Sequence, residues 1–165
     1  MHNRCSRVLK QDSTVYKQNS IRKASSVLSC LRQAASQFSI EWRSSYQIGR
    51  ETLEADRSYD AVIIDYDMGC NCGIDLIREA VAQQYPAPIL LLTGRGTYEV
   101  DVEAMEAGAA DYLNKGEMSP AFLESAIRYA IERKKQEQAL RESEERYRTL
   151  FTSMLKMGLP YTKLF

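Results

Sequence analysis

The sequence predicts an α/β fold in which a parallel β-sheet is covered by helices on both faces. Two runs of consecutive apolar residues, at 61–64 and 89–92, are typical of strands that are buried on both sides. Segments with the 3.6-residue period of amphipathic helices separate these runs, as in βαβ units. A hydrophobic content of 44% is sufficient for a core, and 165 residues suit one domain with an appendage.

The expected elements alternate between helix and strand from about residue 20 onward. Apolar residues recur at helical spacing in the first segment, whereas "FSIEWR" alternates apolar and polar residues, as a half-buried strand does. In chain order we expect a helix at 20–36, a strand at 38–43, a helix at 45–55, a strand at 60–65, a helix at 73–84, a strand at 87–94, a helix at 97–109, a short strand at 111–115 and a helix from 119 past 150.

Polar residues stand where the predicted strands end. Asp65 and Asp67 end one strand, Thr93 ends the next, and Lys115 ends the last. The carboxyl ends of parallel strands form the functional edge of such a sheet, so we expect these residues to converge there. An aspartate can carry a phosphoryl group as an acyl phosphate, while Mg²⁺, an ammonium and a hydroxyl stabilise its charge. The strand ends therefore predict a phosphoryl-accepting site.

Three segments that contain these residues resemble the receiver domain of two-component response regulators: "YDAVIIDYDMG", "PILLLTG" and "AMEAGAADYLNKGE". The resemblance extends over about residues 38–132 and implies that Asp65 is the phosphoacceptor. It also implies that Lys115 contacts the phosphoryl group and that the Thr93 hydroxyl moves with it. Tyr112 matches the switch aromatic residue of that family. The implied fold is a doubly wound, flavodoxin-like sheet of five parallel strands in the order 2-1-3-4-5, with a long C-terminal helix.

The resemblance also implies a Mg²⁺ site formed by the Asp65 carboxylate, the backbone carbonyl of Asp67 and an acidic pair after the first strand. That strand is difficult to find here. We prefer "TVYKQNS" as the strand and loop, which replaces the acids by Gln18 and Asn19. The alternative is "RVLKQDST", which leaves Asp12 as the sole acid. Either assignment predicts weak Mg²⁺ binding.

These features support a receiver module in a phosphorelay, and not an enzyme. The phosphoryl donor would be a histidine kinase or a phosphotransfer protein, and the signal would pass through the C-terminal helix. A degenerate pseudo-receiver that binds partners without phosphorylation is the alternative. Asp65-Tyr66-Asp67 also resembles the D-x-D motif of haloacid-dehalogenase-type phosphatases, but those acids follow the first strand of that fold, and here they follow the third.

The chain is expected to have four parts. These are a basic N-terminal arm at 1–12, the receiver domain at 13–132, a helical or coiled-coil linker at 133–150 and a last segment at 151–165. The segment "ALRESEERYRTLFTSM" resembles the linker and first helix that precede PAS sensor domains. We therefore expect 151–165 to be a truncated and poorly ordered start of such a domain.

The long C-terminal helix also predicts self-association. If Leu123 takes heptad position a, seven of the ten a and d positions down to Met154 are apolar. The charged positions among them include Glu137 and Glu144, which would face their own copies across a parallel dimer. We therefore expect a weak homodimer formed through residues 119–150.

Composition excludes several other classes of protein. The formal net charge of zero gives no reason to expect a nucleic-acid partner. No apolar run approaches the roughly 18 residues that a membrane span needs, so we expect a cytoplasmic protein. Cys70 and Cys72, with His2 as the one histidine, are too few for a zinc site, which needs about four ligands.

Overall fold

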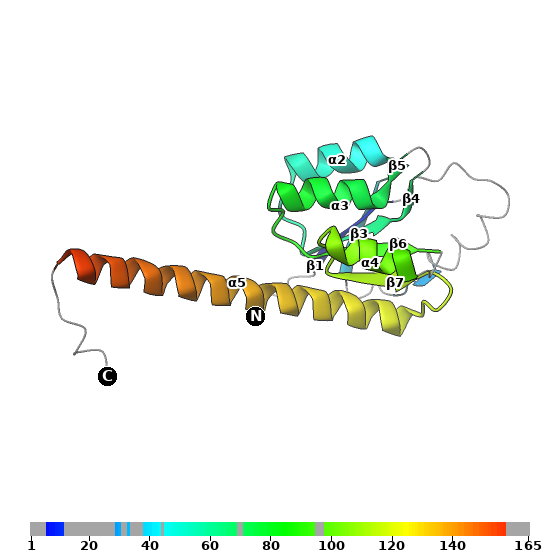
Figure 1. Cartoon of the computed structure of the whole chain (residues 1–165). Helices are drawn as coiled ribbons and strands as arrows, with labels where there is room; N and C mark the ends of the chain where they lie inside the picture. The colour runs from blue at the N-terminus through cyan, green and yellow to red at the C-terminus, as the bar shows by residue number, and fades with distance from the viewer. Residues whose placement is uncertain are drawn as a thin grey trace. The chain divides into compact units, whose positions relative to one another are not determined.

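The computed structural model describes residues 6–11, 29–30, 33, 38–43, 45–68, 71–94 and 98–157, and only the backbone at 6–11, 42 and 71. Five parallel strands form the main sheet in the order β2-β1-β3-β6-β7 (Figure 1). Their bounds are Ser6–Gln11 for β1, Phe38–Arg43 for β2, Ala61–Asp65 for β3, Ile89–Thr93 for β6 and Asp111–Asn114 for β7. The predicted α/β fold with a parallel sheet is confirmed.

The first strand of the sheet lies in the segment that we expected to be a basic arm. β1 pairs in parallel with β2 on one side and with β3 on the other, and Gln11 lies opposite Ile64. The arm at 1–12 and our preference for "TVYKQNS" as the first strand are therefore wrong. β1 is difficult to recognise in the sequence because only two of its residues, Val8 and Leu9, are apolar. Two hydrogen-bonded neighbours stabilise this strand in place of an apolar run.

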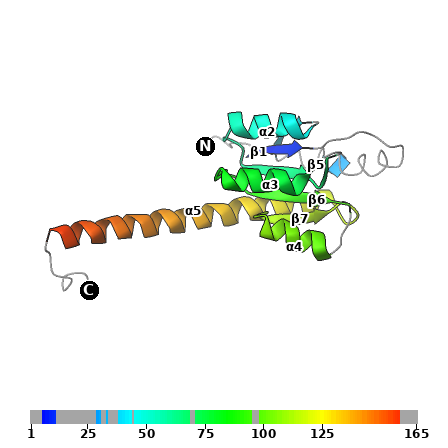
Figure 2. The ribbon, with the colours of Figure 1, turned by 45° about the horizontal axis from the view of Figure 1, so that its top comes forward.

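Helices α2 (Tyr46–Ala55) and α3 (Gly73–Ala82) lie side by side on the sheet (Figures 1 and 2). Helix α4 (Tyr98–Glu106) contributes Ala104 to the same hydrophobic core. All three helices pack on alternate residues of the central strands, such as Ile64 and Leu91. A small antiparallel ribbon of β4 (Asp67–Met68) and β5 (Asn71–Cys72) follows β3.

Helix α5 (Pro120–Lys156) packs against the side chains that alternate with these, including Ile63, Leu92 and Leu113. Its contacts in this core are made by Leu123, Ile127, Ala130 and Ile131. Cys30, one of the few described residues of the first helical segment, is buried in the same core. Because strand residues alternate between the two faces, each buried strand contributes to both cores.

The chain divides into two compact units, Met1–Ile131 and Glu132–Phe165. Leu123 and Ala130, which we placed in the seam of a dimer, are 1% and 3% exposed and belong to the core of the first unit. The first half of the predicted seam is therefore wrong, because core packing produces the same apolar spacing as a coiled coil. Among the described residues, no helix is both long and apolar enough to cross a membrane.

Candidate functional site

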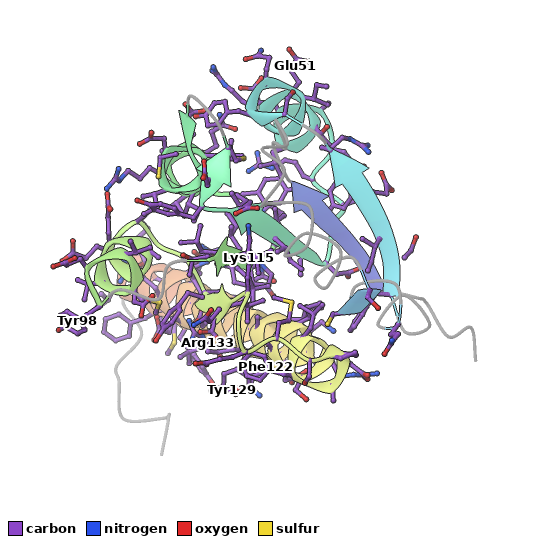
Figure 3. All side chains as sticks on the ribbon, turned by 90° about the vertical axis from the view of Figure 1, so that its right-hand side faces the viewer. Glu51, Tyr98, Lys115, Phe122, Tyr129 and Arg133 are labelled. Atoms are coloured by element: carbon purple, nitrogen blue, oxygen red, sulfur yellow. The ribbon has the colours of Figure 1, made fainter. Side chains whose placement is uncertain are left out.

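The candidate site lies at the carboxyl ends of three neighbouring strands. Asp65 is the last residue of β3, Thr93 is the last residue of β6, and Lys115 directly follows β7. The strand register aligns these ends, since Asp65 lies opposite Leu92 and Thr93 lies opposite Asn114. Figure 3 looks onto this end of the sheet, with Lys115 near the middle of the view. Three residues predicted to converge are thus on adjacent strand ends.

An ion pair joins two of these residues directly. Lys115 Nζ lies 2.5 Å from Asp65 Oδ2, and the two side chains are 20% and 3% exposed. The Lys115 backbone N–H also donates to the Thr93 carbonyl at 2.8 Å, which continues the ladder between β6 and β7 past the end of β7. A buried carboxylate is costly without a compensating charge, so the ammonium of Lys115 stabilises the ionised form of Asp65.

The turn after β3 holds the second oxygen of Asp65. The Asp67 N–H donates to Asp65 Oδ1 at 3.3 Å, while Asp67 itself is exposed. The Tyr66 N–H donates to the Leu92 carbonyl at 2.8 Å, which extends the ladder between β3 and β6 past Asp65. The Asp65 carboxylate is therefore oriented by contacts at both oxygens.

Gly73 is a residue of this site that the sequence analysis did not identify. Its N–H donates to the Tyr66 carbonyl at 2.9 Å, and a Cβ at residue 73 would lie 2.1 Å from the Asp65 carbonyl oxygen. Only glycine allows the start of α3 to approach the end of β3 so closely. The available signal was a glycine at the start of a predicted helix eight residues after Asp65, which does not by itself indicate a contact.

Thr93 and Tyr112 occupy different environments. Thr93 is fully buried, whereas Tyr112 is 39% exposed. The negative charge of Asp101 in α4, followed by burial, raises the pKa of Tyr112. The neighbouring Leu113 points into the core that contains α5, so Tyr112 lies on the opposite face of β7. Asp101 could not be identified from the sequence, because acidic residues occur throughout α4.

The predicted metal ligands are only partly described. Among the described residues no group of three or more His, Cys, Asp or Glu side chains could hold a metal ion. Asp12, Gln18 and Asn19 lie outside the described residues. Of the predicted ligands, the Asp65 carboxylate is the one whose place at the site is described.

The chain belongs to the family of response regulator receiver domains, because the model of that family matches residues 20–128. Among curated proteins, the transcriptional regulatory protein FixJ of Bradyrhizobium diazoefficiens is 43% identical over 76 residues, which are 44% of this chain and 37% of FixJ. The transcriptional regulatory protein QseB of Escherichia coli O157:H7 is 38% identical over 78 residues, 47% of this chain and 35% of QseB. The matched region spans only about a third of each of these relatives.

Solved receiver domains share the fold. The signal receiver domain of a Luxo repressor protein from Vibrio parahaemolyticus superposes with a TM-score of 0.67 at 17% identity, over 82% of this chain and 96% of that domain. A receiver domain protein from Clostridium thermocellum superposes with a TM-score of 0.63 at 29% identity, over 79% of this chain and 98% of that chain. The receiver domain of the sensor histidine kinase PA1611 from Pseudomonas aeruginosa superposes with a TM-score of 0.62 at 21% identity, over 76% of this chain and 97% of that domain. Its structure has magnesium in the active site cleft.

Proposed function

We propose that the first unit is a phosphoaccepting receiver whose phosphoacceptor is Asp65. The observation that carries this proposal is the buried ion pair between Asp65 and Lys115 at the carboxyl edge of the sheet. A carboxylate that is oriented at both oxygens and paired with a cation is suited to attack a phosphorus atom and to hold the product. Family membership supports the same role.

The reaction would transfer a phosphoryl group from a phosphohistidine to Asp65. A carboxylate oxygen of Asp65 forms a bond to phosphorus, the bond between phosphorus and the imidazole nitrogen breaks, and the nitrogen keeps that electron pair. The product is an acyl phosphate. Lys115 then moves from pairing with a carboxylate to pairing with a phosphoryl oxygen, so its charge stabilises both states. The donor would be a histidine kinase or a phosphotransfer protein.

The change at Asp65 would be communicated through Thr93 and Tyr112. A threonine hydroxyl can donate a hydrogen bond to a phosphoryl oxygen, and Thr93 ends the strand beside Asp65. If the Thr93 side chain moves towards the phosphoryl group, the packing between β6, β7 and α4 changes. Tyr112 would report on that packing, because the negative charge of Asp101 in α4 acts on its hydroxyl and raises its pKa. Output would then pass from β7 into α5, which begins six residues after Asn114.

Asp12 is the best candidate for a further Mg²⁺ ligand. It directly follows Gln11 in the sequence, and Gln11 pairs with Ile64, the residue before Asp65. The parallel register brings the end of β1 beside the end of β3, so we propose the next acid in the sequence as the ligand. When bound, Mg²⁺ would neutralise charge on the phosphoryl oxygens. One acid in addition to Asp65, with the Asp67 carbonyl, predicts weak binding.

Labelling with a small phosphodonor tests the assignment. The wild-type chain, incubated with acetyl phosphate and Mg²⁺, should gain the mass of one phosphoryl group, and Asp65→Asn should not. Asp67→Asn is the matched control, since this exposed carboxylate is only two residues away and should remain dispensable. Label that persists in Asp65→Asn, or that disappears only in Asp67→Asn, would refute the proposal.

Metal dependence separates an active receiver from a pseudo-receiver. Asp12→Ala should lower the apparent Mg²⁺ affinity, measured from the metal concentration that gives half-maximal labelling. It should change the free energy of unfolding by no more than about 0.5 kcal/mol. If neither the wild-type chain nor any variant is labelled at saturating Mg²⁺, the first unit is an interaction module that works without phosphorylation.

A further inference from the structure

The described part of the second unit is a helix whose large apolar side chains are exposed. No residue between 132 and 157 is buried. Leu140, Tyr147, Leu150 and Leu155 are 63%, 71%, 56% and 50% exposed. Single exposed apolar residues are common, but a contiguous group of them marks an interaction surface. The question is therefore whether these side chains share one side of the helix.

They do share one side. With 3.6 residues per turn, Tyr147 lies within about 20° of Leu140 around the helix axis, and Leu150, Met154 and Leu155 lie within about 80° of it. We call these five residues the distal stripe. The opposite side of the helix is polar throughout and carries Gln138, Glu142, Glu145, Thr149 and Thr152. The helix of the second unit is therefore amphipathic, although its apolar side is not covered within the described residues of that unit.

We propose that the distal stripe is a self-association surface and that its partner is the same stripe of a second copy of this chain. The surface is complementary to itself, because apolar side chains at intervals of three, four and seven residues pack into the spaces between the same side chains of a second helix.

The area of the distal stripe agrees with a weak dimer. Five partly exposed apolar side chains from each copy, at no more than about 100 Å² each on average, would bury at most a total of about 1,000 Å², at the lower limit of specific interfaces. Residues 132–157 contain seven Lys/Arg and five Asp/Glu, and Glu144, which lies about 40° from Leu140 around the helix axis, would face its own copy in a parallel pair and weaken it. We therefore expect association that depends on protein concentration.

This surface differs from other exposed apolar side chains of the molecule. Phe122 and Tyr129 are 48% and 66% exposed, but they belong to the first unit. Figure 3 shows both on the side of α5 that points away from the sheet. A dimer formed through Phe122 and Tyr129 would be a contact between the first units of two chains. Substitution of Tyr129 would weaken such a dimer, whereas substitution of Tyr147 would not. The proposal does not depend on phosphorylation of Asp65.

Sedimentation equilibrium of the full chain over a range of concentrations tests the proposal with matched variants. Tyr147→Glu and Leu140→Glu place a carboxylate in the distal stripe. Thr149→Glu places the same charge on the polar side, two residues from Tyr147. Tyr129→Glu reports on the first unit. Circular dichroism at a concentration where every variant is monomeric verifies that the helix content is the same.

We expect a monomer–dimer equilibrium for the wild-type chain. Tyr147→Glu and Leu140→Glu should each raise the dissociation constant by at least about tenfold, as the loss of a central apolar anchor does. Thr149→Glu and Tyr129→Glu should change it by no more than about twofold. A wild-type chain that stays monomeric at every concentration overturns the proposal. So does a dimer that the two distal-stripe variants leave intact, or one that only Tyr129→Glu disrupts.

Discussion

Two regions of the molecule depart from ordinary burial in opposite directions. At the carboxyl edge of the sheet, a charged and a polar residue are buried, with Asp65 at 2% and Thr93 at 0% exposure. In the second unit, large apolar residues are exposed, with Tyr147 at 71%. Both exceptions are informative: a buried polar group costs free energy unless it is paired, and a group of large exposed apolar side chains marks a surface that another molecule can cover.

The difference between the regions lies in where that contact comes from. Asp65 finds its partner within the first unit, through Lys115 and the turn at Asp67. The distal stripe finds no cover among the described residues of the second unit, and the proposed cover is a second molecule. Departures from the usual burial of apolar residues and exposure of polar residues are expected at functional sites. Substitutions in the first region should therefore change the free energy of unfolding, whereas substitutions in the distal stripe should change association.

The largest expected effect comes from a pair of leucines on the same helix. Leu123→Ala removes a side chain that is 1% exposed in the core of the first unit, and should lower the free energy of unfolding by about 2–5 kcal/mol. Leu140→Ala makes the same change at 63% exposure and should lower it by less than about 0.5 kcal/mol in the monomer. Urea unfolding followed by circular dichroism measures both, and equal losses would contradict the division into two units.

Removal of the cation from the buried ion pair should have the next largest effect. Lys115→Met leaves the Asp65 carboxylate buried without its ammonium partner, which should cost about 1–3 kcal/mol of unfolding free energy. Asp65→Asn in the same chain should recover most of this loss, since no buried charge then remains. The coupling energy of the double-mutant cycle is the measurement. A value near zero would mean that the two side chains do not stabilise each other.

A methyl group at residue 73 should disturb the site with a loss of stability of about the same size. In Gly73→Ala, the added Cβ would meet the Asp65 carbonyl oxygen at 2.1 Å, so the end of β3 must shift. We expect about 1–3 kcal/mol of destabilisation and slower labelling of Asp65. Gly94→Ala is the control, because its Cβ would have its nearest contact, Lys115 Cδ, at 3.8 Å. Equal labelling rates in the two variants would remove Gly73 from the site.

The smallest effect concerns Tyr46, away from both regions. Burial, followed by a hydrogen bond to Glu79 at 3.0 Å, raises the pKa of Tyr46 to about 12. The folded state therefore keeps this proton at a pH where the unfolded chain, with its ordinary pKa of 10.0, loses it. The stabilisation is complete below pH 10 and is lost as the pH rises to about 12. Tyr46→Phe should flatten this part of the stability profile, and an unchanged slope would contradict the assignment.

Strands β3 and β6 could be predicted because strands covered on both faces consist almost entirely of apolar residues. Their carboxyl ends then indicated Asp65 and Thr93. β1 could not be predicted in the same way, because its place between β2 and β3 depends on backbone pairing that leaves little pattern in "SRVLKQ".

Helix α5 shows a second limit of sequence patterns. Leu123 and Leu140 fit a single heptad register, yet one lies in a core and the other is exposed. Apolar spacing identifies an amphipathic helix but not what covers its apolar side. Contacts such as Gly73 with Asp65, or Asp101 with Tyr112, also depend on segments that the fold brings together. These contacts become visible only in three dimensions.

The central claim is that Asp65 accepts a phosphoryl group, and reductive trapping tests it most directly. Borohydride converts an aspartyl phosphate to homoserine, which mass spectrometry can locate in a peptide. After incubation with acetyl phosphate and Mg²⁺, the peptide that contains Asp65 should carry homoserine at residue 65, in proportion to the label on the intact chain. Homoserine at residue 67, or label on the intact chain with no homoserine at residue 65, would contradict the account.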